Sequence, residues 1–116
     1  MKSFSIHLCG NQNQNLECYK ELHLSEGSWI SSDEKNSLKN VSQVLGTNNI
    51  YAGNVPTHFL VSGSPESVYN WSGELIKEMK YNEGGFVLMP SCDLPTNAKS
   101  INLYAMLKAC REFGKY

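Results

Sequence analysis

Three side chains that could bind a metal ion lie at two places far apart in the sequence. His7 and Cys9 close an apolar run at the start of the chain, and Cys92 follows another apolar run near its end. If both runs are parallel strands of one sheet, their carboxyl ends lie at the same edge, and residues two apart point the same way. An imidazole and two thiols can then converge on one point. This donor set is typical of a zinc site with three protein ligands, which leaves one position open for substrate.

An acidic side chain could complete such a site. Asp33 and Glu34 follow the second apolar run, and either carboxylate could occupy the fourth position until substrate displaces it. The site would suit a thiol substrate, because bound zinc deprotonates a coordinating thiol at neutral pH. Two cysteine thiolates and a neutral histidine already balance the charge of the metal. A third thiolate would therefore stay nucleophilic and could attack an electrophilic methyl group.

Each of these residues also has a simpler explanation. A cysteine in a strand usually belongs to the core, and a histidine at a strand end usually makes a hydrogen bond within a loop. Asp33 and Glu34 would be favourable in the first turn of a helix, where negative charge interacts well with the helix dipole. Asn54 could cap a turn, and His23 and His58 have no evident partner, so we expect both to be structural or exposed.

Four apolar runs have the spacing of strands in a chain that alternates strand and helix. The last run is continuous and apolar, as expected of a strand that is covered on both faces. The strands are predicted at residues 3–8, 28–31, 49–52 and 85–89. Polar or metal-binding side chains follow every one of these strands: His7 and Cys9, Asp33 and Glu34, Asn54, and Cys92 and Asp93.

Helical periodicity fills the segments between the strands. The clearest helix begins after Ser64, a good N-cap, with Pro65 at the first helical position, where its missing N–H has no cost. Cys18 and Cys110 occupy apolar positions in two other helical patterns, so both are predicted to be small buried hydrophobic residues. These other helices are predicted at residues 13–24, 33–45 and 100–113, and a loop is predicted around Pro56, His58 and Phe59.

Alternation of strand and helix predicts an α/β fold with a parallel sheet and right-handed crossovers. Two architectures fit this order of elements. One is a small doubly wound sheet, and the other is half of a TIM-type (β/α)8 barrel, which typically needs about 250 residues. In both, functional groups gather at the carboxyl ends of the strands, where the polar residues of all four units are found.

Composition narrows the classes of function. The chain has 116 residues, enough for one domain, and 10 basic and 11 acidic residues that are well mixed along it. Without a basic stripe there is no indication of a nucleic-acid partner. The apolar runs are far shorter than the roughly 20 residues that span a membrane, and no export signal is evident, so a cytoplasmic location is the default expectation.

Several short motifs occur in one order along nearly the whole chain. They are His-Leu-Cys-Gly-Asn at 7–11, Asp-Glu-Lys at 33–35, Gly-Asn-Val at 53–55, Ser-Pro-Glu at 64–66 and Gly-Gly-Phe-Val-Leu-Met-Pro-Ser-Cys-Asp-Leu-Pro at 84–95. This series resembles the C-terminal half of the uroporphyrinogen decarboxylase superfamily. It is most similar to the zinc-dependent branch, the methylcobamide:coenzyme M methyltransferases. The resemblance implies that residues 1–116 are a single domain, the C-terminal half of a TIM-type barrel.

The resemblance also implies a site and its partners. His7, Cys9 and Cys92 match the zinc ligands of the family, with an acidic residue as a labile fourth ligand, for which Glu34 is slightly favoured over its neighbour. Asn54 is the candidate for substrate binding. The zinc would activate a thiol such as coenzyme M, which takes a methyl group from a methyl-corrinoid carried by a partner protein. The decarboxylases themselves use no metal and lack the His-x-Cys pair, so this pair favours methyl transfer.

The sequence departs from the family in three respects, and one of them is a longer segment, residues 22–28, at the end of the first predicted helix. Asn54-Val55-Pro56 lacks the aspartate that commonly follows the valine, and about half of the barrel is absent. A half-barrel has two free edges and a bare inner face, for which Ile6, Val87 and Met89 are candidates, so we expect a homodimer or pairing with a separate N-terminal half. The alternatives are a non-catalytic half-barrel that binds or assembles with a partner, and a metal-free decarboxylase relative that acts on a tetrapyrrole.

Overall fold

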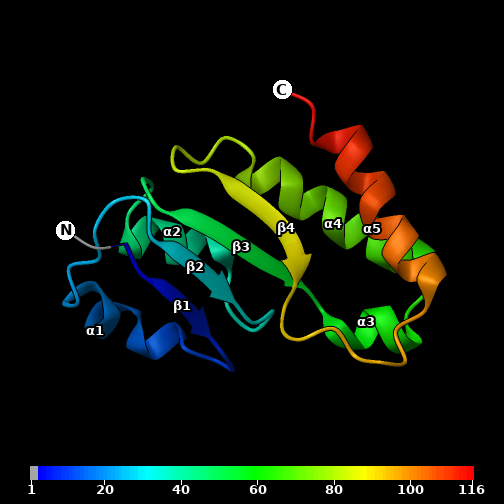
Figure 1. Cartoon of the computed structure of the whole chain (residues 1–116), viewed down its shortest axis with the longest axis horizontal. Helices are drawn as coiled ribbons and strands as arrows, with labels where there is room; N and C mark the ends of the chain where they lie inside the picture. Colours follow the sequence, from blue (N-terminus) through cyan, green and yellow to red (C-terminus); the bar gives the residue numbers. More distant parts are fainter. Residues whose placement is uncertain (1–2) are drawn as a thin grey trace.

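The computed structural model describes residues 3–116 and contains one parallel sheet of four strands in the order β1-β2-β3-β4 (Figure 1). The strands are β1 (Ser5–Leu8), β2 (Trp29–Ser32), β3 (Ile50–Val55) and β4 (Phe86–Pro90). Every strand pairs in parallel with the next one along the chain. A doubly wound sheet would reverse its strand order part-way. The unbroken order is that of half of a (β/α)8 barrel, which decides between the two predicted architectures.

Within the described residues, one 3-10 turn and four α-helices connect the strands, and a fifth α-helix follows β4. Helix α4 begins as predicted, since the Oγ of Ser64 accepts a hydrogen bond from the N–H of Ser67 at 3.1 Å. Helix α5 spans the predicted residues. The elements are η1 (Asn13–Asn15), α1 (Leu16–Lys20), α2 (Leu38–Leu45), α3 (Thr57–Ser62), α4 (Pro65–Met79) and α5 (Ser100–Phe113).

The helices differ from the sequence prediction in three places. Helix α1 is shorter than predicted and ends at Lys20. Helix α2 begins only after Ser37, whose Oγ accepts from the N–H of Asn40, so residues 33–37 form a loop. The segment around Pro56, predicted to be a loop, continues into helix α3, because Leu60 is fully buried in the core there.

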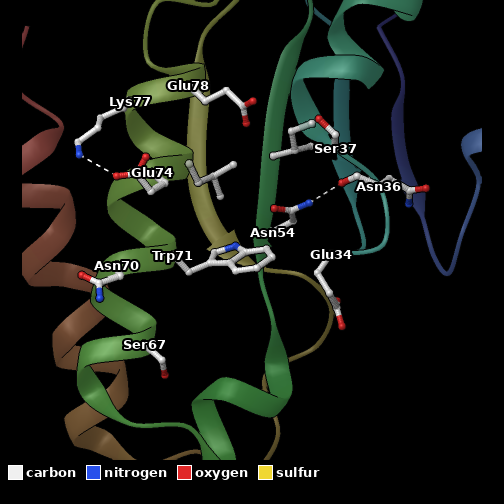
Figure 2. A pocket seen from close by; sticks show the side chains of 12 residues that line it. Glu34, Asn36, Ser37, Asn54, Ser67, Asn70, Trp71, Glu74, Lys77 and Glu78 are labelled. Atoms are coloured by element: carbon white, nitrogen blue, oxygen red, sulfur yellow. Dashed lines mark hydrogen bonds and ion pairs between the residues drawn. The ribbon is translucent and has the colours of Figure 1, made fainter.

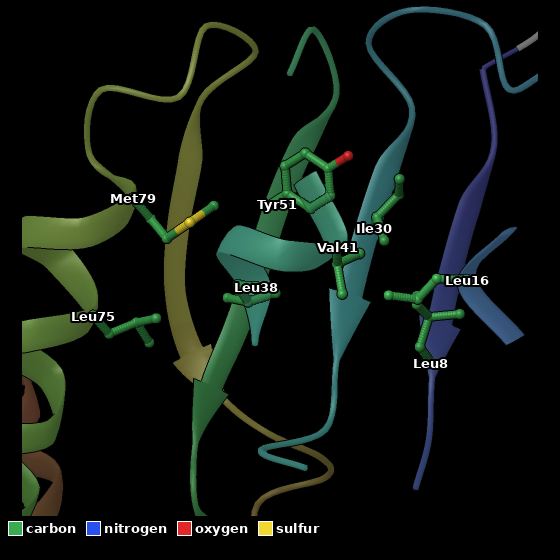
Figure 3. Packing of buried hydrophobic residues seen from close by; sticks show 8 residues of the cluster. All are labelled: Leu8, Leu16, Ile30, Leu38, Val41, Tyr51, Leu75 and Met79. Carbon is green, nitrogen blue, oxygen red and sulfur yellow. The ribbon is translucent and has the colours of Figure 1, made fainter. Parts of the chain in front are cut away.

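The main core lies between one face of the sheet and the helices. Leu8, Ile30 and Tyr51 point from three strands into this layer, and the Tyr51 hydroxyl donates to the carbonyl of Gly46 at 2.7 Å. Burial of such side chains stabilises the fold by about 1.5–3 kcal/mol each. Figure 3 shows the cluster, which consists of Leu8, Leu16, Ile30, Leu38, Val41, Tyr51, Leu75 and Met79.

The other face of the sheet is incompletely covered. Phe86 and Leu88 pack against the main core, so alternation points Val87 and Met89 to the opposite face, as predicted. Val87 is 36% exposed, so β4 is not covered on both faces as expected from its apolar sequence. Ile6 was expected on this open face, but it packs against the helix-covered core instead, because it alternates with His7.

Two cysteines predicted to be buried are exposed, namely Cys18 and Cys110. On α5 the buried face consists of Asn102, Ala105 and Ala109. Small alanine side chains let α5 approach its neighbours closely. Leu103 and Met106 are partly buried beside this contact, whereas Ile101, Tyr104 and Leu107 are exposed. No helix among the described residues is long and apolar enough to cross a membrane.

Candidate metal centre

His7, Cys9 and Cys92 come together at the carboxyl edge of the sheet. One nitrogen of His7 and the two sulfur atoms all lie within 4.8 Å of one another. His7 lies in β1, Cys9 follows that strand, and Cys92 follows β4. Strands β1 and β4 are the two outer strands, which β2 and β3 separate. Three strand spacings would put the strands about 14 Å apart in a flat sheet. Curvature of the sheet and the segment that follows β4 therefore bring Cys92 to the other two residues.

Ser31 on the neighbouring strand orients the imidazole of His7. The two residues are partners in the β1–β2 register, and the Nδ1 of His7 lies 2.8 Å from the Oγ of Ser31. Ser31 Oγ also lies 3.4 Å from the carbonyl oxygen of Ile6, which can accept its proton. This arrangement favours the tautomer with a proton on Nδ1, and it leaves the lone pair of Nε2 free for a metal. Sequence reasoning missed Ser31, whose position opposite His7 depends on strand register.

A turn after β1 presents Cys9 and is fixed by Asp33. Gly10 has φ +71°, a left-handed conformation that strains residues with a Cβ atom. Its N–H donates to Oδ2 of Asp33 at 3.2 Å, and the N–H of Lys35 donates to Oδ1 at 3.0 Å. Oδ2 of Asp33 thus links the loop after β1 to the loop after β2, and Oδ1 stabilises the loop to which Asp33 belongs, which gives this carboxylate a structural role.

The same hydrogen bonds shift the ionisation of Asp33. Partial burial by itself would raise the pKa of this carboxyl, but the backbone N–H groups of Lys35 and Gly10 stabilise its charged form. The net result is a pKa below the ordinary value of 3.8. Asp33 therefore keeps its negative charge at neutral pH, where it can accept both hydrogen bonds.

Glu34 lies away from the metal-binding group. The group defined by the 4.8 Å limit, as found among residues 3–116, contains only His7, Cys9 and Cys92. Oε1 of Glu34 is 3.8 Å from Nδ1 of His58, whose side chain is 64% exposed, as expected for this histidine. Glu34 would have to leave His58 and move toward the sulfur atoms to ligate a metal held there.

Asn54 is buried and holds the strand-end loops in place. Its Nδ2 donates to the backbone carbonyls of Asp33 at 3.2 Å and Asn36 at 2.8 Å. Asn36 in turn accepts from the N–H of Gln12 at 2.7 Å and donates to the carbonyl of Gly10 at 2.8 Å. The loops after β1 and β2 and the end of β3 therefore form one hydrogen-bonded unit beside His7 and Cys9.

Comparison with known proteins identifies the family and agrees with the fold. The family model for uroporphyrinogen decarboxylase (URO-D) matches residues 2–113. The chain belongs to the URO-D family. A solved structure, a methyltransferase from Methanosarcina mazei, superimposes with a TM-score of 0.76 at 27% identity, over 98% of this chain and 32% of that one. This chain thus spans about a third of the length of that methyltransferase. No curated protein matches the chain.

The carboxyl ends of the four strands and the loops that follow them form the rim of the sheet. A cavity of about 830 Å³ lies beside this rim, between α2 and α4 (Figure 2). Glu34 and Asn54 reach its wall from the strand ends, and Trp71 lies across it from α4. The side chain of Trp71 is held by an edge contact with Phe59, with ring centroids 5.7 Å apart. None of the three metal-binding residues lines this cavity, so the cavity and the His/Cys group are separate features of the rim.

Proposed function

We propose that this chain is the zinc-binding part of a corrinoid-dependent methyltransferase, in which zinc activates a thiol that accepts a methyl group from a methyl-corrinoid. One observation carries the proposal: the ligand atoms of His7, Cys9 and Cys92 lie within 4.8 Å of one another at the strand ends of a URO-D-family sheet. The methyltransferase from Methanosarcina mazei supports the class of reaction.

The donor set fits zinc. Thiolate sulfur and imidazole nitrogen suit Zn²⁺, whereas magnesium and calcium prefer oxygen ligands. Cys9 and Cys92 are both exposed, so an ion in solution has access to them. The hydrogen bond between His7 and Ser31 holds one nitrogen and leaves the other as a donor. Three protein ligands leave a fourth position, which Glu34 would occupy at rest.

In this proposal the residues at the strand ends bind the metal, balance its charge and leave a position for the thiol that is alkylated. Zinc, when bound, would hold the incoming thiol as a thiolate at neutral pH. Cys9 and Cys92 supply two negative charges, and the neutral His7 adds none, so the charge of the ion is already balanced. Glu34 would leave the fourth position when the thiol binds and would return to His58. Asn54 would contact the substrate at the edge of the rim.

The open face of the sheet and the proposed reaction indicate which partners this proposal requires. The substrate would be a thiol such as coenzyme M, and a corrinoid protein would bring the methyl group to the exposed rim. The open face, with Val87 and Met89, needs a second wall to exclude water from the reaction. A second copy of the chain, as a homodimer, or a separate N-terminal half would supply that wall.

The first test is the metal content of protein purified without chelator in buffer that contains zinc. We expect near-stoichiometric zinc by elemental analysis, and its loss in Cys9→Ser and Cys92→Ser. The second test is demethylation of methylcobalamin by coenzyme M, followed by its visible absorbance. Protein that folds but binds no zinc would overturn the proposal.

A non-catalytic assembly module is the second candidate, favoured by the incompletely covered face around Val87. It predicts zinc binding without thiol-dependent demethylation, even when an N-terminal half is added. A metal-free decarboxylase relative would neither bind zinc nor demethylate methylcobalamin. The two measurements together therefore separate all three functions.

A further inference from the structure

We propose that Cys9 and Cys92 form a redox modification site, in which a small-molecule disulfide converts the two thiols into a reversible intramolecular disulfide. The site uses two of the three residues on which the proposed function rests. Formation of the disulfide itself does not require that function, because it depends only on the position of the two sulfur atoms.

The two sulfur atoms are close enough to bond after a modest movement. They lie within 4.8 Å of each other, and a disulfide needs about 2.0 Å, a difference that side-chain rotation and a small loop shift can supply. Cys9 follows the last residue of β1, and Cys92 lies two residues beyond β4. Neither residue belongs to a strand, so both can adjust without breaking the sheet.

Both thiols are also exposed, so a reagent in solution can reach them. The thiolate of one cysteine attacks the sulfur–sulfur bond of the reagent, forms a mixed disulfide and releases one thiolate of the reagent. The second cysteine then attacks the cysteine sulfur of the mixed disulfide and releases the other half. The cysteines lose two electrons, the reagent gains them, and the two cysteine protons end on the two released thiols.

The disulfide would have two consequences for the rim. It would link the segments after β1 and β4, the two outer strands of the sheet, and so close a loop that contains most of the chain. Closure of a long loop restricts the unfolded chain, so the oxidised protein should unfold at a higher denaturant concentration. The disulfide would also remove two thiolate ligands of the proposed zinc site. Oxidation and metal binding should therefore exclude each other, a consequence that rests on the proposed function.

The chain contains its own matched controls. Cys18 on α1 and Cys110 on α5 are exposed like the proposed pair, yet neither belongs to the close group. The Cys18→Ser/Cys110→Ser double variant should therefore still form the disulfide. Cys9→Ser and Cys92→Ser should stop at a mixed disulfide with the reagent.

The experiment treats metal-free protein with oxidised glutathione and measures intact mass and the cross-linked peptides. In the Cys18→Ser/Cys110→Ser variant we expect loss of two hydrogen atoms and a Cys9–Cys92 peptide pair, both reversed by dithiothreitol. Zinc added beforehand should slow the reaction about tenfold or more, because coordination occupies the sulfur electron pairs. Release of zinc on oxidation is read with a chromogenic chelator.

The outcomes separate this inference from the proposed function. Stable glutathione adducts on both Cys9 and Cys92, with no linked peptide, would overturn the inference even if zinc binds. A Cys9–Cys92 disulfide in protein that never binds zinc would leave the inference standing and contradict the proposed function. A His7→Ala variant sharpens this distinction, because it should lose zinc affinity and keep the disulfide.

Discussion

Two neighbouring parts of the strand-end rim are built in opposite ways. The group of His7, Cys9 and Cys92 is largely exposed, offers nitrogen and sulfur, and has few partners within the protein. The network of Asn36 and Asn54 is buried, and its amides are hydrogen-bonded to backbone groups of the two loops that follow β1 and β2. The contrast teaches that exposed, reactive side chains are positioned by a buried hydrogen-bonded network beside them. Residues from the family-like motifs therefore have two different roles, metal binding and structural support.

The largest effect should come from removing a sulfur ligand. Cys9→Ser or Cys92→Ser should weaken zinc binding by about 100-fold or more, because a hydroxyl replaces a thiolate and second-shell changes alone cost about 10–100-fold. Competition with a chromophoric chelator measures the affinity. Cys18→Ser, an exposed cysteine outside the group, should bind zinc as the unchanged protein does. Equal zinc affinity in all three variants would contradict the metal-binding role of Cys9 and Cys92.

Next, loss of the supporting amide should affect stability rather than metal chemistry. Asn54→Ala leaves the carbonyls of Asp33 and Asn36 without this donor, and we expect a loss of about 2–4 kcal/mol in the free energy of unfolding. Urea titration measures this loss. Zinc affinity of the folded variant should change by much less than in the cysteine variants. A stable Asn54→Ala protein would show that the network does not support the rim.

A smaller effect is expected where the two regions meet. Ser31→Ala removes the hydrogen bond that orients His7, and loss of such a second-shell contact should weaken zinc binding about tenfold. Ser32→Ala serves as the matched control, since this neighbouring serine is buried and has its hydroxyl directed to the carbonyl of Asp33. If both variants bind zinc equally, the orienting role of Ser31 is wrong.

The smallest effect should come from the labile ligand. Glu34→Gln should reduce zinc affinity by less than about tenfold, because three stronger ligands remain and Glu34 starts at His58. Isothermal titration with zinc, with and without coenzyme M, measures the change. We expect the difference between the variant and the unchanged protein to vanish once the thiol is bound. A loss as large as that of Cys9→Ser would make Glu34 a permanent ligand.

Local signals predicted much of the fold. Ser64 and Pro65 predicted the start of α4, and the bounds of α5 agree with its periodicity. Helix α3 could not be predicted in this way, because its six residues are stabilised by long-range contacts of Leu60 and by Asn102, whose amide donates to three carbonyls near its end. Exposure of Cys110 was likewise missed, because periodicity does not say which side of a helix meets its neighbour.

The sequence by itself determined the residue types of the candidate site, the alternation of strand and helix, and the strand ends at which the site residues lie. These depend on local composition and on the periods of helix and strand. Only the tertiary structure decided that Cys92 reaches His7 and Cys9 across the sheet, that Ser31 orients the imidazole, and that Glu34 contacts His58. Such relations depend on strand order, register and curvature, which arise from contacts between residues far apart in the chain.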